Sequence, residues 1–411
     1  MKGVEKVHFF DIHPMNLMKS LSMALELTVN GMSTHHWRTA LIADCIAKEL
    51  KLEELKWQEV VYAALIHDIG AVSNWEERKL LRTMDDNSKR IYLHAEEGYE
   101  LLLLSKRFEK LAKPIRYHHD NWCGGNPSGL AGDKIPLASR IIHLADRIEV
   151  SIYPGTYIFD QKNKILDYVD EKSGTAFDPN LVDAFNQCAK SEAFWLDLIN
   201  PNYKEVFFSS LDVYGSISYT LEDVTEIADI FSIIIDKTSR YTAKHSRGVA
   251  EVAAYLAKQA GFSPSEVKEM RIAGLLHDLG KLAIPNEILE KPEKLTEEEY
   301  LLIKQHTYYT YRILQGIDNF EKIAQWAAYH HETLDGTGYP FRISEDSLSL
   351  GSKILAVADV FTALTEDRPY RESLSEEKVK DIMGKMAKYR RLDKQIIDLL
   401  FEHYQDARAF I

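Results

Sequence analysis

Histidine and aspartate side chains in the C-terminal half of the chain form a set that could bind metal ions. Imidazole nitrogens and carboxylate oxygens suit divalent first-row metals, iron or manganese rather than a structural zinc, and that half contains no cysteine. The two oxygens of Asp278 could bridge neighbouring ions, as a two-metal centre requires. Asp359 could complete the shell of one ion, and the adjacent His330 and His331 could cap the other. The candidate ligands of two ions are His245, His277, Asp278, His306, His330, His331 and Asp359.

Taken one at a time, these residues also have structural explanations. A His-Asp pair that ends an apolar helix, such as His277-Asp278, is often a hydrogen-bonded structural pair, and the same holds for a lone histidine such as His306. The set as a whole is harder to explain in this way, because in the C-terminal half only His403 lies outside it. We therefore favour the metal-binding interpretation.

The same motifs occur earlier in the chain, so the sequence contains an internal repeat. The motif "YAALIHDIG", which ends at Gly70, returns as "IAGLLHDLG", which ends at Gly280. The motif "IRYHHD" ending at Asp120 returns as "AAYHHE" ending at Glu332, and "IIHLADR" returns as "ILAVADV". The offsets stay near 210–213 residues, and each copy closes with a similar tail. A nearly constant offset indicates one duplicated unit.

Helices must position these side chains, because the apolar periodicity is helical nearly everywhere. Apolar residues recur at spacings of three and four, as in half-buried helices, within residues 40–50, 59–66, 249–258 and 266–276. Strand-like alternation is scarce, and its clearest example is residues 206–219. Glycine and proline interrupt the helical pattern at residues 124–127 and 336–340. We therefore predict an all-α fold.

The length of the chain favours two domains. A chain of 411 residues with 45% hydrophobic content can bury two ordinary cores. Together with the repeat, this predicts two tandem helical domains, at residues 1–205 and 222–411, joined by a linker at residues 206–221.

Composition also bears on the partners of the protein. The net charge of -13 argues against affinity for DNA, RNA or acidic lipid headgroups, so a phosphate-bearing ligand would need locally supplied positive charge, which metal ions offer. Cys45, Cys123 and Cys188 show no paired spacing, so neither a disulfide framework nor a thiolate zinc site is predicted. Neither a signal peptide nor a membrane-spanning run is apparent. We therefore expect a cytoplasmic protein with no membrane partner.

Longer motifs in the C-terminal half resemble a known family. His245, His277-Asp278 and Asp359 resemble the H…HD…D signature of the HD phosphohydrolase superfamily. The segments "HDLGKLAIP", "KLTEEEYLLIKQH", "HHETLDGTGYP" and "AVADVFTALTEDRPYR" closely resemble its HD-GYP subfamily. These motifs span nearly the whole C-terminal half, so the resemblance is specific. With its N-terminal copy, the chain resembles the tandem arrangement called HD-[HD-GYP], which implies two HD-type helical domains.

The resemblance implies a metal-dependent phosphodiesterase that hydrolyses a cyclic dinucleotide, typically cyclic di-GMP and in some members 3′,3′-cyclic GMP-AMP. A hydroxide bridging two metal ions would attack phosphorus, while the ions neutralise the phosphodiester oxygens. Linear dinucleotide would be the first product. The resemblance assigns one metal to His245, His277, Asp278 and Asp359, and the other to Asp278, His306, His330 and His331.

Further residues are expected to contact the substrate. Lys281 lies close to the His-Asp pair and could add positive charge at a nonbridging phosphate oxygen, so we predict catalytic roles for Lys281 and Asp278. Arg368 and Tyr370 in "DRPYR" resemble family residues near the ligand phosphates, although anchoring of the loop is an alternative role. A tight loop beside the metals is expected because glycine permits positive φ and proline stiffens the chain. The loop residues predicted to contact substrate are Gly338, Tyr339 and Pro340.

Two positions depart from the family pattern. Some members bind a third metal, which requires a glutamate four residues before the first histidine, and here that position is Tyr241. We therefore predict a two-metal site. Thr362 stands where many relatives have an aspartate, which leaves the substrate preference open.

The N-terminal copy keeps the ligand types but loses the substrate residues. Ala71 replaces Lys281, and "CGGNP" replaces the "DGTGYP" loop. His35 preserves the spacing to the His-Asp pair, whereas His36 preserves the spacing to the arginine that follows. The sequence therefore does not decide which of the two histidines is the first ligand. One or two further ions with a regulatory or structural role are expected, with a metal-free scaffold or a second active phosphohydrolase as alternatives. The candidate ligands are His35, His36, His67, Asp68, His94, His118, His119 and Asp146.

Two other functions compete with the phosphodiesterase. One is a metal-containing sensor that binds a cyclic dinucleotide without turnover, and the other is an HD phosphohydrolase that acts on another nucleotide. The intact Lys281 and the complete ligand set favour an enzyme over a sensor, and the "GYP" loop argues against other nucleotides. A homo-oligomer or a signalling partner bound through the N-terminal copy is compatible with the sequence.

Overall fold

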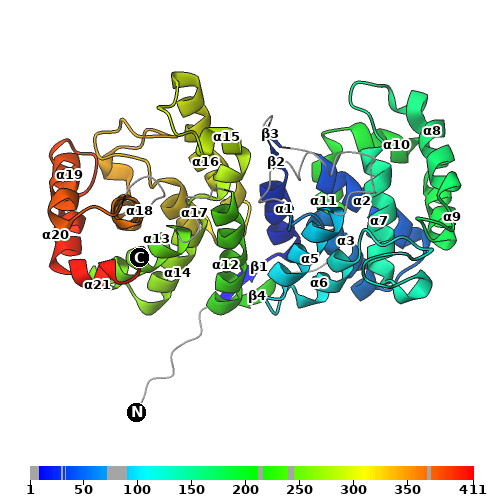
Figure 1. Cartoon of the computed structure of the whole chain (residues 1–411), viewed down its shortest axis with the longest axis horizontal. Helices are drawn as coiled ribbons and strands as arrows, with labels where there is room; N and C mark the ends of the chain where they lie inside the picture. The colour runs from blue at the N-terminus through cyan, green and yellow to red at the C-terminus, as the bar shows by residue number, and fades with distance from the viewer. Residues whose placement is uncertain are drawn as a thin grey trace, which may run out of the picture. The chain divides into compact units, whose positions relative to one another are not determined.

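The computed structural model describes residues 9–28, 31–32, 34–71, 90–211, 216–238, 245–367 and 372–411. Helices dominate these residues, so the expected all-α fold class is confirmed (Figure 1). The chain divides into two compact units. We call the unit with residues 21–26 and 34–211 the N-terminal lobe. The unit with residues 9–20, 27–28 and 216–411 is the C-terminal lobe.

The N-terminal lobe is a bundle in which α2 packs against α3, α7 and α9, and α5 packs against α6. Wholly buried Trp37, Ile42 and Ile46 place the apolar face of α2 in the core. The first strands and helices are β1 (Phe9–Ile12), α1 (Pro14–Leu25), β2 (Leu27–Thr28) and β3 (Gly31–Met32). The helices of the lobe are α2 (His35–Glu49), α3 (Glu54–Leu65), α5 (Arg90–Leu102), α6 (Glu109–Arg116), η1 (Gly132–Lys134), α7 (Leu137–Val150), α8 (Ile158–Glu171), α9 (Pro179–Cys188), α10 (Glu192–Ile199) and α11 (Tyr203–Ser210).

The C-terminal lobe repeats this arrangement, because α13 packs against α14 and α18 as α2 packs against α3 and α7. Side chains that are fully buried along α13 and α18 include Val249, Leu256 and Phe361. The elements are β4 (Ile217–Thr220), α12 (Leu221–Lys237), α13 (His245–Gln259), α14 (Pro264–Leu276), η2 (Leu279–Ala283), α15 (Asn286–Leu289), α16 (Glu297–Leu314), α17 (Glu321–Ala328), η3 (Glu345–Ser347), α18 (Leu350–Thr365), α19 (Glu376–Lys388), α20 (Lys394–Glu402) and α21 (Tyr404–Arg408).

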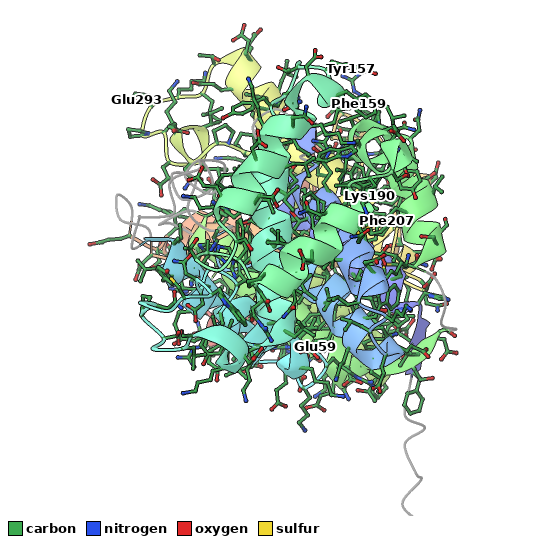
Figure 2. All side chains as sticks on the ribbon, turned by 90° about the vertical axis from the view of Figure 1, so that its right-hand side faces the viewer. Glu59, Tyr157, Phe159, Lys190, Phe207 and Glu293 are labelled. Carbon is green, nitrogen blue, oxygen red and sulfur yellow. The ribbon has the colours of Figure 1, made fainter. Side chains whose placement is uncertain are left out.

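The four segments with predicted helical periodicity lie in α2, α3, α13 and α14, so those predictions are confirmed. The strand-like alternation at residues 206–219 was misleading. Residues up to Ser210 belong to α11, because Phe207, Phe208 and Leu211 are buried at helical spacing while Val206 is exposed (Phe207 is labelled in Figure 2). Among the described residues of this segment, the strand is confined to β4, Ile217–Thr220.

Residues 9–20 belong to the C-terminal lobe. Strand β1 pairs antiparallel with β4, with Phe10 opposite Tyr219. The Asp318 carboxylate accepts hydrogen bonds from the His13 backbone N–H at 2.8 Å and from the Asn16 amide at 3.1 Å. The compact units therefore differ from the expected division at residues 1–205 and 222–411, since residues 9–20 pack with the second lobe.

Within the part of the chain that the structure describes, none of the helices has both the length and the apolar character needed to span a bilayer.

Candidate metal centre

The helices of the C-terminal lobe bring the seven candidate ligands into one cluster. His245 begins α13, His277 follows α14, His306 lies within α16, and Asp359 lies within α18. Six of the seven side chains are buried, and His331 is half-buried. Ligand atoms lie within 4.8 Å of one another in each of three overlapping groups: His245, His277 and Asp359; His277, Asp278 and His330; His306, His330 and His331.

Asp278 lies between the groups. Its Oδ2 is 3.2 Å from Nε2 of His277, and its Oδ1 is 3.4 Å from Nε2 of His306. Asp359 Oδ1 lies 3.2 Å from Nε2 of His245 and 3.9 Å from Nε2 of His277. Each oxygen of Asp278 therefore faces a different histidine, which is the arrangement that a carboxylate bridging two cations needs.

In four of the histidines the ring nitrogen Nδ1, which faces away from the cluster, has an oxygen partner of its own. Nδ1 of His277 lies 2.7 Å from the Gly274 carbonyl, and Nδ1 of His306 and of His330 lies 2.6 Å from the carbonyl three residues earlier. His245 is the first residue of its helix and has no helical carbonyl before it. Its Nδ1 lies 3.0 Å from Oε2 of Glu366. These contacts direct each Nε2 into the cluster, as partners of metal-bound histidines do.

The buried polar atoms fit a metal site. Among the described residues, Nε2 of His277 and Oδ1 of Asp278 are buried without a hydrogen-bond partner. Buried polar atoms are normally satisfied, so this pair needs a further partner such as a cation. Burial lowers the pKa of His306 to about 3. Burial opposes ionisation of Asp278, but the neighbouring His277 and Lys281 hold its pKa well below the usual range.

A close backbone approach fixes the geometry of this cluster. A Cβ atom on Gly280 would lie 1.9 Å from the carbonyl oxygen of His306, so only glycine lets η2 lie against α16. The N-terminal lobe has the same close approach, because a Cβ atom on Gly70 would lie 2.0 Å from the carbonyl oxygen of His94. The glycine in each "HD(L/I)G" motif therefore sets the distance between the His-Asp pair and the next histidine.

The predicted loop residues lie beside this cluster. The Tyr339 backbone N–H donates to the carbonyl of His331 at 3.2 Å, and their rings lie 4.9 Å apart. Gly338 packs against the backbone of Glu332, where a Cβ atom would lie 2.5 Å from Cα. The Glu332 carboxylate accepts three backbone N–H groups at the loop exit, just after Pro340.

Lys281 forms an ion pair with Asp278. Its Nζ lies 2.5 Å from Asp278 Oδ2, and its side chain is 23% exposed, so it reaches both the cluster and solvent. Tyr241, Arg368 and Tyr370 lie outside the described residues.

The N-terminal lobe has the same arrangement. Asp68 Oδ2 lies 3.3 Å from Nε2 of His35 and 3.5 Å from Nε2 of His67, and its Oδ1 lies 3.4 Å from Nε2 of His94. Asp146 Oδ1 lies 3.4 Å from Nε2 of His35. The two groups whose ligand atoms lie within 4.8 Å are His35, His36, His67 and Asp68, and His94, His118 and His119.

His35 matches His245 in its surroundings. Its Nδ1 lies 2.6 Å from Oε2 of Glu149, as that of His245 faces Glu366. His36 lies in the same group, and its Nε2 is 3.7 Å from Asp68 Oδ2. The structure therefore brings both candidates to the site instead of separating them.

Sequence reasoning missed three acidic partners, Glu149, Glu366 and Glu332, and the buried Arg147. Arg147 donates to Asp146 Oδ2 from Nη2 at 2.6 Å. Glu149 follows Asp146 by three residues on one helix, and Glu332 directly follows the His-His pair. The spacing from a predicted ligand could therefore have identified both glutamates. Glu366 lies seven residues after Asp359, which is two helical turns, so its spacing could also have identified it.

The family is identified by a match that covers both lobes. The model of a family described as HD domain matches residues 19–181 and 229–396. The chain belongs to the HD domain family. Both HD lobes are therefore members of one fold, as the internal repeat indicated.

Individual relatives match either nearly the whole chain or part of it. The chain is 33% identical over 380 residues to a 3′3′-cGAMP-specific phosphodiesterase of Vibrio cholerae, covering 90% of this chain and 87% of that protein. It is 40% identical over 145 residues to a cyclic di-GMP phosphodiesterase of Pseudomonas aeruginosa, covering 35% of each. The crystal structure of a cyclic GMP-AMP-specific phosphodiesterase of V. cholerae aligns with a TM-score of 0.68 and 27% identity, over 97% of this chain and 98% of that one.

These matches confirm the resemblance to the HD-GYP family in its tandem HD-[HD-GYP] arrangement, and the expectation that the chain is an enzyme of this hydrolase family.

Proposed function

We propose that the C-terminal HD lobe hydrolyses a cyclic dinucleotide, cyclic di-GMP or 3′,3′-cyclic GMP-AMP, at a centre of two divalent metal ions. The observation that carries this proposal is the position of Asp278, whose two buried oxygens face different histidines. The substrate class follows the activities for which relatives that match one or both lobes are named. One ion would be held by His245, His277, Asp278 and Asp359, and the other by Asp278, His306, His330 and His331.

Two bound cations would lower the pKa of a water molecule between them and neutralise phosphodiester oxygens. The side chains of the protein would position the metal ligands and the substrate. Asp278 lies between the two groups of histidines and fixes their relative positions. Lys281 brings a positive charge to the side of Asp278 from which solvent can be reached. Because the chain has a net charge of -13, this local charge is what allows an anionic ligand to approach. Tyr339 presents an aromatic ring beside His331, where a base of the ligand could stack.

The N-terminal HD lobe is proposed to be regulatory or structural. Its position 71, the counterpart of Lys281, is a buried alanine, so it offers no amine at the equivalent point. Iron or manganese is the proposed metal of the C-terminal centre, because the donors are nitrogen and oxygen atoms alone.

The test is turnover by anaerobically purified, iron- or manganese-loaded protein with each cyclic dinucleotide, coupled to metal quantification. The wild-type chain should release linear dinucleotide, whereas Asp278→Asn should lose both turnover and C-terminal metal. His403→Gln is the matched control, because His403 lies outside the cluster and contacts Tyr255. Tight binding of either ligand without product would support a sensor instead of an enzyme.

A further inference from the structure

The N-terminal HD lobe has an imidazole that the C-terminal HD lobe lacks. His36 follows His35 at the start of α2, and the equivalent position in α13 is Ser246. The Ser246 hydroxyl donates to Asp236 at 2.6 Å and is engaged there. His36 is 4% exposed, and neither of its ring nitrogens has a hydrogen-bond partner. Nε2 of His36 lies 3.7 Å from Asp68 Oδ2, which is too far for a hydrogen bond. A buried imidazole without a hydrogen bond is costly, so a further ligand would stabilise this ring.

The unpartnered ring lies at the candidate metal cluster. Nitrogen atoms of His35, His36 and His67 and an oxygen of Asp68 all lie within 4.8 Å of one another, and all four residues are buried. Asp146 Oδ1 also lies 3.4 Å from Nε2 of His35, so the N-terminal set consists of His35, His36, His67, Asp68 and Asp146. The corresponding C-terminal set is His245, His277, Asp278 and Asp359, so the N-terminal set contains one protein donor more.

Two neighbouring residues make the same centre less open to a phosphate ligand. Arg147 binds Asp146 Oδ2 from both Nε, at 3.0 Å, and Nη2, at 2.6 Å, so a guanidinium covers the second oxygen of that carboxylate. Ala71 replaces the lysine that reaches solvent in the other lobe. A catalytic metal needs an open coordination position, whereas a structural one is enclosed by protein donors.

We propose that His36 is a metal ligand of the N-terminal HD lobe, and that it fills a coordination position which the C-terminal lobe leaves open by having Ser246 there. The ion would be a divalent first-row metal that accepts an imidazole-rich donor set, with zinc or iron(II) as the best fit. It would be held without an exchangeable position. The inference rests on the proposed binding of metal by clustered His and Asp groups, but it concerns a separate site.

Zinc release from the full-length protein tests this assignment. Protein loaded with Zn²⁺ alone is mixed with a chromogenic chelator, and the number and rate of ions released are recorded. His36→Ser, which installs the residue of the other lobe, should release one ion per chain at least about tenfold faster than wild type, since even outer partners of metal ligands cost 10–100-fold. His143→Gln is the control, because His143 is a buried histidine of the same lobe outside both groups, and it should behave as wild type.

Two further readouts separate a ligand from a structural residue. The visible absorption of bound Co²⁺ depends on its coordination number and on its imidazole ligands, so the absorption of the N-terminal ion should change in His36→Ser and His36→Gln relative to wild type. Metal-free wild type and variants should melt alike, and added Zn²⁺ should raise the melting temperature less in the variants. Hydrolysis of cyclic dinucleotide by the C-terminal lobe should persist in His36→Ser.

The outcomes distinguish the two proposals. Zinc release and cobalt absorption that are the same in His36→Ser as in wild type would overturn the assignment of His36 while leaving the C-terminal centre intact. Binding of no metal by either lobe would overturn the proposed function as well. An N-terminal ion that is lost together with turnover in a folded His36→Ser protein would contradict a closed, non-catalytic centre.

Discussion

At the scale of single residues, the two lobes use the same carboxylate geometry and differ in the cations around it. Asp278 and Asp68 each direct one oxygen to the first group of histidines and the other oxygen to the second. Among the described residues, Asp278 meets a lysine, at 2.5 Å, whereas Asp68 does not. The lobes therefore differ in two cations, Lys281 beside Asp278 in the C-terminal lobe and Arg147 beside Asp146 in the N-terminal lobe.

Lys281→Met should lower kcat for cyclic dinucleotide hydrolysis by about 10²–10³-fold, the usual cost of removing one donor that stabilises developing charge. The metal content should stay close to that of wild type, because Nζ is not in any of the three ligand groups. Steady-state kinetics with metal analysis on the same preparation checks this. A kcat equal to that of wild type would exclude a catalytic role for the lysine.

His245 should release a proton when metal binds. Burial disfavours its charge, but hydrogen bonds to Asp359 and Glu366 raise its pKa to about 10, so the metal-free ring is protonated at neutral pH. A ligand must be deprotonated, so metal affinity of this lobe should rise with pH between about pH 6 and 9, by about one proton per ion bound at this histidine. Calorimetric titration with Mn²⁺ in buffers of different ionisation enthalpy measures the proton count.

Glu366 should act as a positioning residue for His245. Glu366→Gln should weaken metal binding by about 10–100-fold, as loss of an outer partner does, and should reduce the proton release on binding. The N-terminal lobe suggests a rescue, because Glu149 lies three residues after Asp146, where the C-terminal lobe has Thr362 with a buried, unpartnered hydroxyl. Thr362→Glu combined with Glu366→Gln should recover affinity. Failure of this rescue in a folded protein would mean that Glu366 has another role.

The ligand types were predictable from the sequence because they recur at nearly constant offsets, and the offset reports a shared fold. Glu366 could not be found in this way, because its counterpart Glu149 lies at a different distance from the metal-binding aspartate. The choice between His35 and His36 was also beyond sequence, since both rings reach the cluster from the first turn of α2.

At the scale of elements, the contact of η2 with α16 sets the distance between Asp278 and His306. Gly280→Ala would place a Cβ atom 1.9 Å from a backbone carbonyl that cannot rotate away, so it should destabilise the lobe by at least about 1–3 kcal/mol, the usual cost of overpacking. Gly384→Ala is the control, because Gly384 is exposed on α19 with no atom within 4 Å of the added Cβ. It should be neutral or stabilising by about 0.4–1 kcal/mol.

Chemical denaturation and metal content distinguish these two glycine variants. Gly280→Ala should lose metal at concentrations that saturate wild type, whereas Gly384→Ala should bind normally. Equal stability of both variants would show that η2 and α16 can separate without cost. Helix periodicity predicted the individual helices well, but residues 206–211 read as a strand because two adjacent phenylalanines and a leucine fit either period over so short a segment.

At the scale of the whole molecule, residues 9–20 are part of the C-terminal lobe. The motifs carry no sign of this, because β1 has four residues and its partner β4 lies more than 200 residues away. Such a pairing depends on long-range contacts that local pattern does not encode. The repeat predicted two lobes, but it could not predict which lobe receives the segment that precedes the first copy.

Phe10→Ala should therefore destabilise the C-terminal lobe although the substitution is near the N-terminus. Phe10 is 3% exposed and its ring lies 5.6 Å from that of Phe320, so truncation should cost about 3–5 kcal/mol. Phe9→Ala is the matched control, since Phe9 is the preceding strand residue with 52% of its surface exposed, and it should change stability by less than about 0.5 kcal/mol. Hydrogen exchange locates the effect. In Phe10→Ala, protection of backbone amides should fall in β4 and α17 and stay unchanged in α3 and α7. A loss of protection confined to α3 and α7 would contradict the assignment of β1 to the C-terminal lobe.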